Sequence, residues 1–223
     1  MQRNNEFFKQ VDCDITIFES YSNEINDIFS SYLETLTSVI TIYEVLTGEF
    51  PIAIANEIRA IFTHLARVSC TELSEEHRKE NVKQAQRHMK RAILDGYKYS
   101  CLAYFDNYNH FLKEYANIDL SLIDNGEFIL KTSQLFDQAK KSLIKAKKIE
   151  TNPGNTEDQL YENYEEAYRY FSELYLYVND NIEKANRLIL RQHENIKKKK
   201  ISDFVLWIVT ILSLIFGILG WMK

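Results

Sequence analysis

The chain has 223 residues, of which only six are glycine and two are proline, and its formal net charge is −5. So few helix breakers, together with many Glu, Lys, Leu, Ile and Tyr residues, predict an all-α protein built from long helices. The acidic balance does not indicate a general nucleic-acid-binding surface, and the sequence has no glycine-rich phosphate loop, which excludes a Rossmann domain or a P-loop ATPase. The three cysteines lack metal-ligand spacing and suit a reducing cytosol, so no metal site and no cofactor is expected.

The first helix is predicted between residues 12 and 48. Apolar side chains recur there at alternating steps of three and four, which is a heptad stripe that only Ser22 interrupts. Asp12 or Asp14 can cap its start, and the segment from Gly48 to Pro51 ends it. The stripe consists of Ile15, Phe18, Ser22, Ile25, Phe29, Tyr32, Leu36, Val39, Tyr43 and Leu46.

The next two helices are predicted to pack against each other. The segment from Pro51 to Ser69 is apolar on most faces, so we expect it at the centre of the bundle. Ser74 can cap a helix that extends as far as Ala116, with a bend at Gly96. The early face of that helix carries residues that are mostly small and would let a partner helix approach closely: Val82, Ala85, Met89, Ala92 and Gly96.

The remaining soluble part is predicted to contain two more helices. One runs from about Ser121 to Lys148, and the other starts at a capping box formed by Thr156 and Gln159. The expected architecture is an elongated antiparallel bundle of about five helices followed by a C-terminal transmembrane helix. In this division residues 1–150 form the bundle, residues 151–200 a long heptad helix that packs on it and leads to the membrane, and residues 201–223 the anchor.

The last segment predicts the anchor itself. The stretch from Phe204 to Met222 holds no charge, and a helix of this length covers roughly 28 Å, about the thickness of the hydrocarbon core of a bilayer. Trp207 and Trp221 lie near its two ends, where indole rings favour the headgroup region. A run of basic residues precedes it and predicts that everything before the run is cytoplasmic. This run consists of Lys197, Lys198, Lys199 and Lys200.

A set of polar side chains interrupts the two central helices. Glu57 and His64 are seven residues apart and share a face, whereas Arg59 lies about 140° around the helix from His64. An ionised side chain in a mostly buried helix has to be paired or solvated. We therefore expect these helices to enclose a polar pocket, which is either a functional site or an ion-pair network that fixes helix register. Its expected members are Glu57, Arg59, His64, His88, Arg91 and Asp95.

The spacing Arg59-x4-His64 in an all-helical bundle resembles the HEPN superfamily, many of whose members are metal-independent ribonucleases of bacterial immunity. The resemblance implies that Arg59 and His64 are catalytic and that two subunits contribute them as a pair. His64 would then serve as the general acid/base, and Arg59 would stabilise the negative charge of the transition state. The next residue is Ala60, where active members commonly have a polar residue.

The combination with a membrane segment is also similar to the HEPN-like membrane accessory proteins of type VI-B CRISPR systems. Those proteins carry the motif but are membrane pores, and their membrane segment is N-terminal rather than C-terminal. The resemblance implies a role in prokaryotic antiviral defence, with RNA or a protein of the defence system as a partner.

Three functions follow from these features. The first is a tail-anchored membrane effector or accessory protein that forms homo-oligomers and perturbs the lipid bilayer, with its N-terminal domain in the cytoplasm and its anchor in the bacterial inner membrane. The second is an enzyme, a membrane-tethered HEPN-type ribonuclease. The third is a coiled-coil membrane tether, which would give the polar pocket no role. The acidic charge and Ala60 favour the first over the second.

Overall fold

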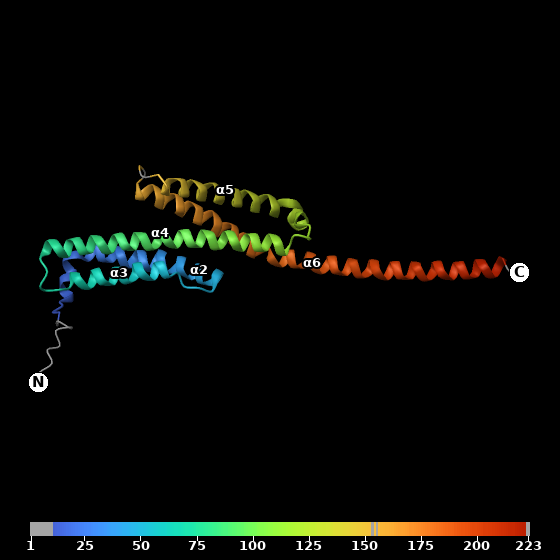
Figure 1. Cartoon of the computed structure of the whole chain (residues 1–223), viewed down its shortest axis with the longest axis horizontal. Helices are drawn as coiled ribbons and strands as arrows, with labels where there is room; N and C mark the ends of the chain where they lie inside the picture. The colour runs from blue at the N-terminus through green and yellow to red at the C-terminus, as the bar shows by residue number, and fades with distance from the viewer. Residues whose placement is uncertain (1–10, 153, 155, 222–223) are drawn as a thin grey trace, which may run out of the picture. The chain divides into compact units, whose positions relative to one another are not determined.

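The computed structural model describes residues 11–152, 154 and 156–221, and the side chains of all of these except 157 and 212–221. Within this part of the chain the fold is all-helical, which confirms the predicted class (Figure 1). The elements in chain order are η1 (Ile15–Tyr21), α1 (Ser22–Ser31), η2 (Tyr32–Leu36), α2 (Thr37–Thr47), α3 (Ile52–Val68), α4 (Glu75–Glu114), η3 (Leu120–Gly126), α5 (Glu127–Glu150) and α6 (Glu157–Trp221).

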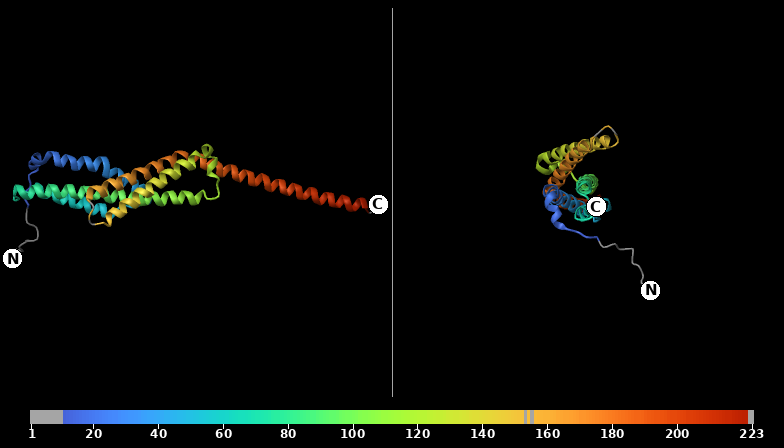
Figure 2. Two further views of the ribbon diagram at one scale, coloured as in Figure 1. Left: turned by 90° about the horizontal axis from the view of Figure 1, so that it is seen from above. Right: turned by 90° about the vertical axis from the view of Figure 1, so that its left-hand side faces the viewer.

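The chain divides into two compact units. Unit 1 comprises Met1–Tyr108 and Asp137–Ser172, and unit 2 comprises Asn109–Phe136 and Glu173–Lys223. The three long helices α4, α5 and α6 therefore contribute a segment to each unit. In unit 1 the second part of α5 runs antiparallel to the start of α6, and the short connection after α5 joins them (Figure 2).

The prediction of one regular helix between residues 12 and 48 is wrong, because this segment is divided into η1, α1, η2 and α2. It begins with the 3-10 helix η1, which is capped by the carboxylate of Asp14 through a 2.9 Å hydrogen bond from the amide of Thr16. The π-helical segment η2 then separates α1 from α2. Ile15 and Phe29 of the expected stripe are exposed, and both precede this π-helical segment. Ile25, Leu36 and Val39 of the expected stripe are buried, and so are Tyr21, Ile28 and Ile40, which the stripe did not include.

Helix α3 is amphipathic, so the prediction of a helix buried on most faces is wrong. Ile54 and Leu65 belong to its buried face, whereas Ile52 and Phe62 are 76% and 66% exposed. The apolar composition of α3 did not predict its burial, because the other helices of unit 1 cover only one side of it. Its polar face is therefore open to solvent.

Helix α4 continues through Gly96 without interruption. A Cβ atom at Gly96 would lie 2.7 Å from Cγ1 of Val39 and 3.6 Å from Cδ1 of Ile54. The glycine thus lets α2 and α3 approach α4 closely. The other members of the predicted stripe are buried as expected: Val82, Ala85, Met89 and Ala92.

The capping box predicted at the start of α6 is confirmed. The amide of Thr156 donates to Oε1 of Gln159, and the amide of Gln159 donates to the hydroxyl of Thr156, both over 3.3 Å. These reciprocal bonds satisfy two amides that the first turn of a helix leaves unpaired. From there α6 is a single helix of 65 residues.

In unit 2 the side chains of α6 pack on α5 and on the residues that follow α4. The rings of Phe128 and Tyr177 stack with centroids 5.8 Å apart, and the hydroxyl of Tyr115 donates to Asn186 over 2.5 Å. Further along α6, the side-chain nitrogen Nε2 of Gln192 donates to the backbone carbonyl oxygen of Asn117 over 3.2 Å. Beyond this bond, residues 193–211 are all exposed.

Among residues 11–211, no helix holds an apolar stretch long enough to cross a membrane. The predicted span runs from Phe204 to Met222. The structure does not describe the side chains of residues 212–221, which include Trp221, and Met222 lies outside the described residues. The flanking residues Lys197 to Lys200 and Trp207 lie on α6 and are exposed.

Candidate functional site

Two side-chain contacts join α3 to α4 in unit 1. Nδ1 of His88 lies 2.6 Å from Oε2 of Glu57, and Nδ1 of His64 lies 2.8 Å from Oδ1 of Asn81. The two imidazole rings stack between these contacts, with centroids 5.2 Å apart and planes 22° from parallel. We call this group, Glu57, His64, Asn81 and His88, the two-histidine cluster.

The spacing of these residues in the sequence explains how they meet. Glu57 and His64 are seven residues apart on α3, and Asn81 and His88 are seven apart on α4, so each pair occupies one face of its helix. The short connection between α3 and α4 makes the helices antiparallel. The first residue of one pair therefore faces the second residue of the other.

The hydrogen bonds assign the protons of His64. The amide nitrogen of Asn81 donates to the carbonyl oxygen of His77 over 2.8 Å, so the oxygen of Asn81 is the atom that faces the imidazole. Nδ1 of His64 accordingly carries a proton and donates it. In the neutral ring the basic nitrogen is then Nε2, which is the arrangement that a general base requires.

The cluster is partly open to water. The side chains of His88 and Glu57 are 20% and 19% exposed, and His64 is half-buried. Because a carboxylate oxygen only accepts hydrogen bonds, Nδ1 of His88 is the donor to Glu57. The site therefore holds two imidazole rings, each oriented by a hydrogen bond at Nδ1. Within the described residues, no group of three or more His, Cys, Asp or Glu residues is placed to bind a metal ion.

The structure brings together three of the six residues expected in the pocket, Glu57, His64 and His88. Arg59 and Arg91 are instead exposed. Asn81 was missed, although its seven-residue distance from His88 repeats the spacing on α3. An amide carries no charge, so a pattern of ionisable residues does not include Asn81.

Asp95 belongs mainly to a second polar group, which extends from α4 to α5 and α6 in unit 1. Lys98 lies 3.9 Å from Asp95 and 2.6 Å from Glu150, and the hydroxyl of Tyr164 donates to Glu150 over 2.7 Å. Burial raises the pKa of Asp95, Lys98 opposes this shift, and the charges of Glu57 and Glu150 add to it. Burial also pushes the pKa of Glu150 upward, but the hydrogen bonds from Lys98 and Tyr164 outweigh it and lower the pKa. These residues line a cleft of about 390 Å³.

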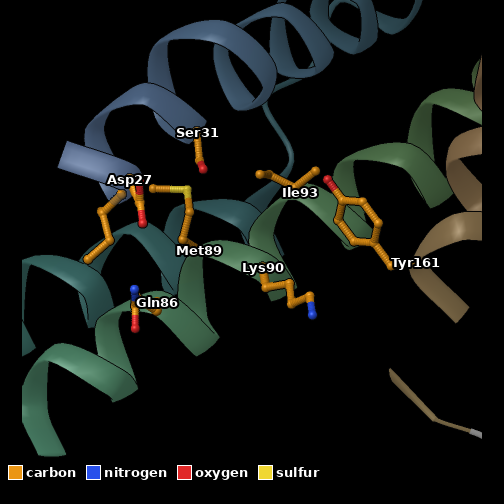
Figure 3. A pocket seen from close by; sticks show the side chains of 8 residues that line it. Asp27, Ser31, Gln86, Met89, Lys90, Ile93 and Tyr161 are labelled. Carbon is orange, nitrogen blue, oxygen red and sulfur yellow. The ribbon is translucent and has the colours of Figure 1, made fainter. Parts of the chain in front are cut away.

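A further cleft of about 270 Å³ lies between α1, α4 and α6 (Figure 3). Apolar side chains form part of its wall, and Asp27 and Lys90 supply the charges. The ammonium group of Lys90 forms an ion pair with Asp158. This cleft lacks a pair of groups suited to proton transfer, so the two-histidine cluster is the stronger candidate site. The lining residues are Asp27, Ile28, Ser31, Gln86, Met89, Lys90, Ile93 and Tyr161.

Comparison of the chain with protein family models, with curated proteins and with solved structures finds no match.

Proposed function

We propose that the protein is a membrane effector whose helical units are attached to the bilayer by the end of α6. The observation that carries the proposal is the continuity of this helix, which leads from the packed part of unit 2 into an exposed apolar segment. Phe204, Leu206 and Trp207 are each 61% exposed. A continuous apolar surface of this kind is unfavourable in water and favourable in lipid.

The sequence of the anchor gives the proposed orientation. The uncharged stretch from Phe204 to Met222 is long enough to span the hydrocarbon core, and Trp207 and Trp221 would lie at its two interfaces. The run from Lys197 to Lys200 would stay on the cytoplasmic side, next to anionic lipid. The N-terminal units would then be cytoplasmic at a bacterial inner membrane.

The proposed mode of action is clustering of several anchors through homo-oligomers of the helical units. One apolar helix cannot line an aqueous path, so a single copy would leave the bilayer intact. The hydroxyl of Thr210 donates to the carbonyl oxygen of Leu206 over 2.8 Å, which leaves little polarity for a lining. Several copies would therefore form a wide pore or disorder the lipid. The resemblance to HEPN-like accessory proteins adds antiviral defence as the proposed setting.

Vesicle experiments test both parts of this proposal. We expect the full chain to float with vesicles of anionic lipid and to release an enclosed dye, whereas the chain that ends at Lys200 stays in the soluble fraction. A matched control replaces Phe204 to Met222 by an unrelated apolar span of equal length. It should keep attachment, and retained dye release would show that clustering rather than the anchor sequence is decisive. A full chain that stays soluble in the flotation would refute the proposal.

A second candidate, a membrane-tethered ribonuclease of the HEPN type, is favoured by the orientation of His64. The hydrogen bond to Asn81 leaves Nε2 as the basic nitrogen, ready to take a proton from a ribose hydroxyl. Arg59 is exposed and lies about 140° around α3 from His64, so a pair made of these two residues would need a second copy of the chain.

Cleavage of RNA in the presence of a chelator tests this candidate. The variants Arg59→Ala and His64→Ala should each be inactive, and a mixture of the two should recover activity if each site takes one residue from each subunit. Intact RNA with the wild-type chain, together with dye release from vesicles, would leave the membrane effector as the function.

A further inference from the structure

Cys13 and Cys70 face each other, although 56 residues separate them in the sequence. They form an isolated antiparallel bridge between the residues before η1 and the connection from α3 to α4 in unit 1. The amide of Asp14 donates to the carbonyl oxygen of Ser69 over 2.8 Å, and the amide of Thr71 donates to that of Asp12 over 3.0 Å. Both hydrogen bonds flank the cysteine pair rather than join it.

This pattern defines the geometry of the pair. Facing residues between two such hydrogen bonds form the closer type of antiparallel pair, with Cα atoms about 4.5 Å apart and side chains on the same face. Disulfides occur at Cα separations of about 4.4–6.8 Å. The backbone therefore already has a separation at which an S–S bond can form.

The surroundings hold the backbone in this position and leave the sulfurs accessible. The guanidinium of Arg78 donates to the carbonyl oxygens of Cys70 and Thr71, with distances of 3.1–3.3 Å. Cys13 is exposed and Cys70 is partly exposed, and both are free thiols. Cys101 offers a contrast, because it is buried and burial raises the pKa of its thiol.

We propose that Cys13 and Cys70 form a reversible disulfide by exchange with a low-molecular-weight disulfide. The thiolate of one cysteine attacks a sulfur of the small disulfide, bonds to it and expels one small thiolate. The second cysteine thiolate attacks the protein sulfur of this mixed disulfide, which forms the Cys13–Cys70 bond and expels the second small thiolate. The small disulfide gains two electrons, and the two protons lost by the cysteines end on the released thiols.

The bond would fasten the start of η1 to the connection between α3 and α4. That connection follows His64 by a few residues and precedes Asn81, so it sets how the two sides of the two-histidine cluster meet. A closed loop of this length restricts the unfolded chain and thereby stabilises the folded one. Oxidation would make unit 1 more stable and more rigid at this end.

The test uses the full chain in mild detergent with oxidised glutathione, followed by peptide mapping of the alkylated protein. We expect a peptide pair linked through Cys13 and Cys70, with Cys101 unlinked, and a melting temperature raised by roughly 5–15 °C. The control Cys101→Ser should behave like the wild type. Cys13→Ser and Cys70→Ser should lose the linked pair and the rise in melting temperature, and dithiothreitol should reverse both in the wild type.

Two results would overturn the proposal. One is separate glutathione adducts on Cys13 and Cys70 with no linked peptide pair. The other is a link between two chains, which would show that the sulfurs face away from each other in solution.

Discussion

The imidazole of His88 lies over that of His64, with ring centroids 5.2 Å apart. Each ring is held through Nδ1, by Glu57 in one case and by Asn81 in the other. The stack therefore connects α3 to α4 and at the same time orients two nitrogen bases. His64 can have a structural role, a catalytic role or both. Arg59 is outside the two-histidine cluster and can have only a catalytic role, so substitutions of the two residues distinguish the roles.

The first prediction separates these roles. His64→Ala should lower the free energy of unfolding by about 1–2 kcal/mol, because it removes a partly buried hydrogen bond and the ring stack. Arg59→Ala should change it by less than about 0.5 kcal/mol, since Arg59 is exposed. Denaturant unfolding of the full chain in mild detergent gives both values. Loss of cellular activity in Arg59→Ala at unchanged stability would assign a functional role to Arg59, whereas a large loss of stability would contradict the exposed position.

The second prediction concerns the close approach of α2 to α4. Gly96→Ala adds a methyl group 2.7 Å from Cγ1 of Val39, and the resulting overlap should outweigh the better helix propensity of alanine. We expect a net loss of about 1 kcal/mol in the free energy of unfolding. In a Val39→Ala background the same change should stabilise by about 1 kcal/mol. A stabilising effect of Gly96→Ala in the wild-type background would show that α2 can move away.

The third prediction is a dependence on pH that follows from Asp95. Its pKa is raised in the folded protein, mainly by burial, so folding favours the protonated carboxyl. This contribution is complete below the ordinary pKa of 3.8 and is lost as the pH rises through the raised value. The wild type should therefore lose stability relative to Asp95→Asn as the pH increases over that window. Unfolding of both proteins in a series of buffers measures the difference, and a constant difference would contradict the shift.

The fourth prediction has the opposite sign. The pKa of Glu150 is lowered because the hydrogen bonds from Lys98 and Tyr164 outweigh the effect of burial. The stabilisation is present above the ordinary pKa of 4.5 and is lost as the pH falls through the lowered value. Glu150→Gln should thus be less stable than the wild type at pH 7, and the two should converge in acid. Equal stability of the two proteins at pH 7 would mean that the ion pair with Lys98 contributes nothing.

Much of the fold follows from local rules in the sequence. The capping box at Thr156 was predictable because the first turn of a helix leaves amides unpaired. The buried face ahead of Gly96 was predictable because its side chains are mostly small. The π-helical segment at Tyr32 was not predictable in this way. The segment from Tyr32 to Leu36 contains no glycine or proline that would mark it.

The candidate site was predicted in part, because some of its features depend on local spacing and others on the packing of distant segments. The seven-residue spacing of Glu57 and His64 identified the right face of α3, because spacing determines which side chains lie together. The position of Arg59 depends on how much of α3 its neighbours cover, which apolar composition alone does not reveal. The meeting of Cys13 with Cys70 depends on the path of the whole first half of the chain.

The last prediction rests on the proposed membrane function and on the continuity of α6. Ser202 is exposed and lies between the lysine run and the apolar span, where proline would remove a backbone hydrogen bond and break the helix. Because the helix makes its bond to Asn117 before this point, through Gln192, the stability of the two units should change by less than about 0.5 kcal/mol. Ser202→Pro should still float with vesicles, yet its dye release should fall to the level of vesicles without protein, whereas Ser202→Ala should match the wild type. Dye release at the wild-type rate in Ser202→Pro would mean that the anchors need only be close to one another and that a rigid connection to unit 2 is unnecessary.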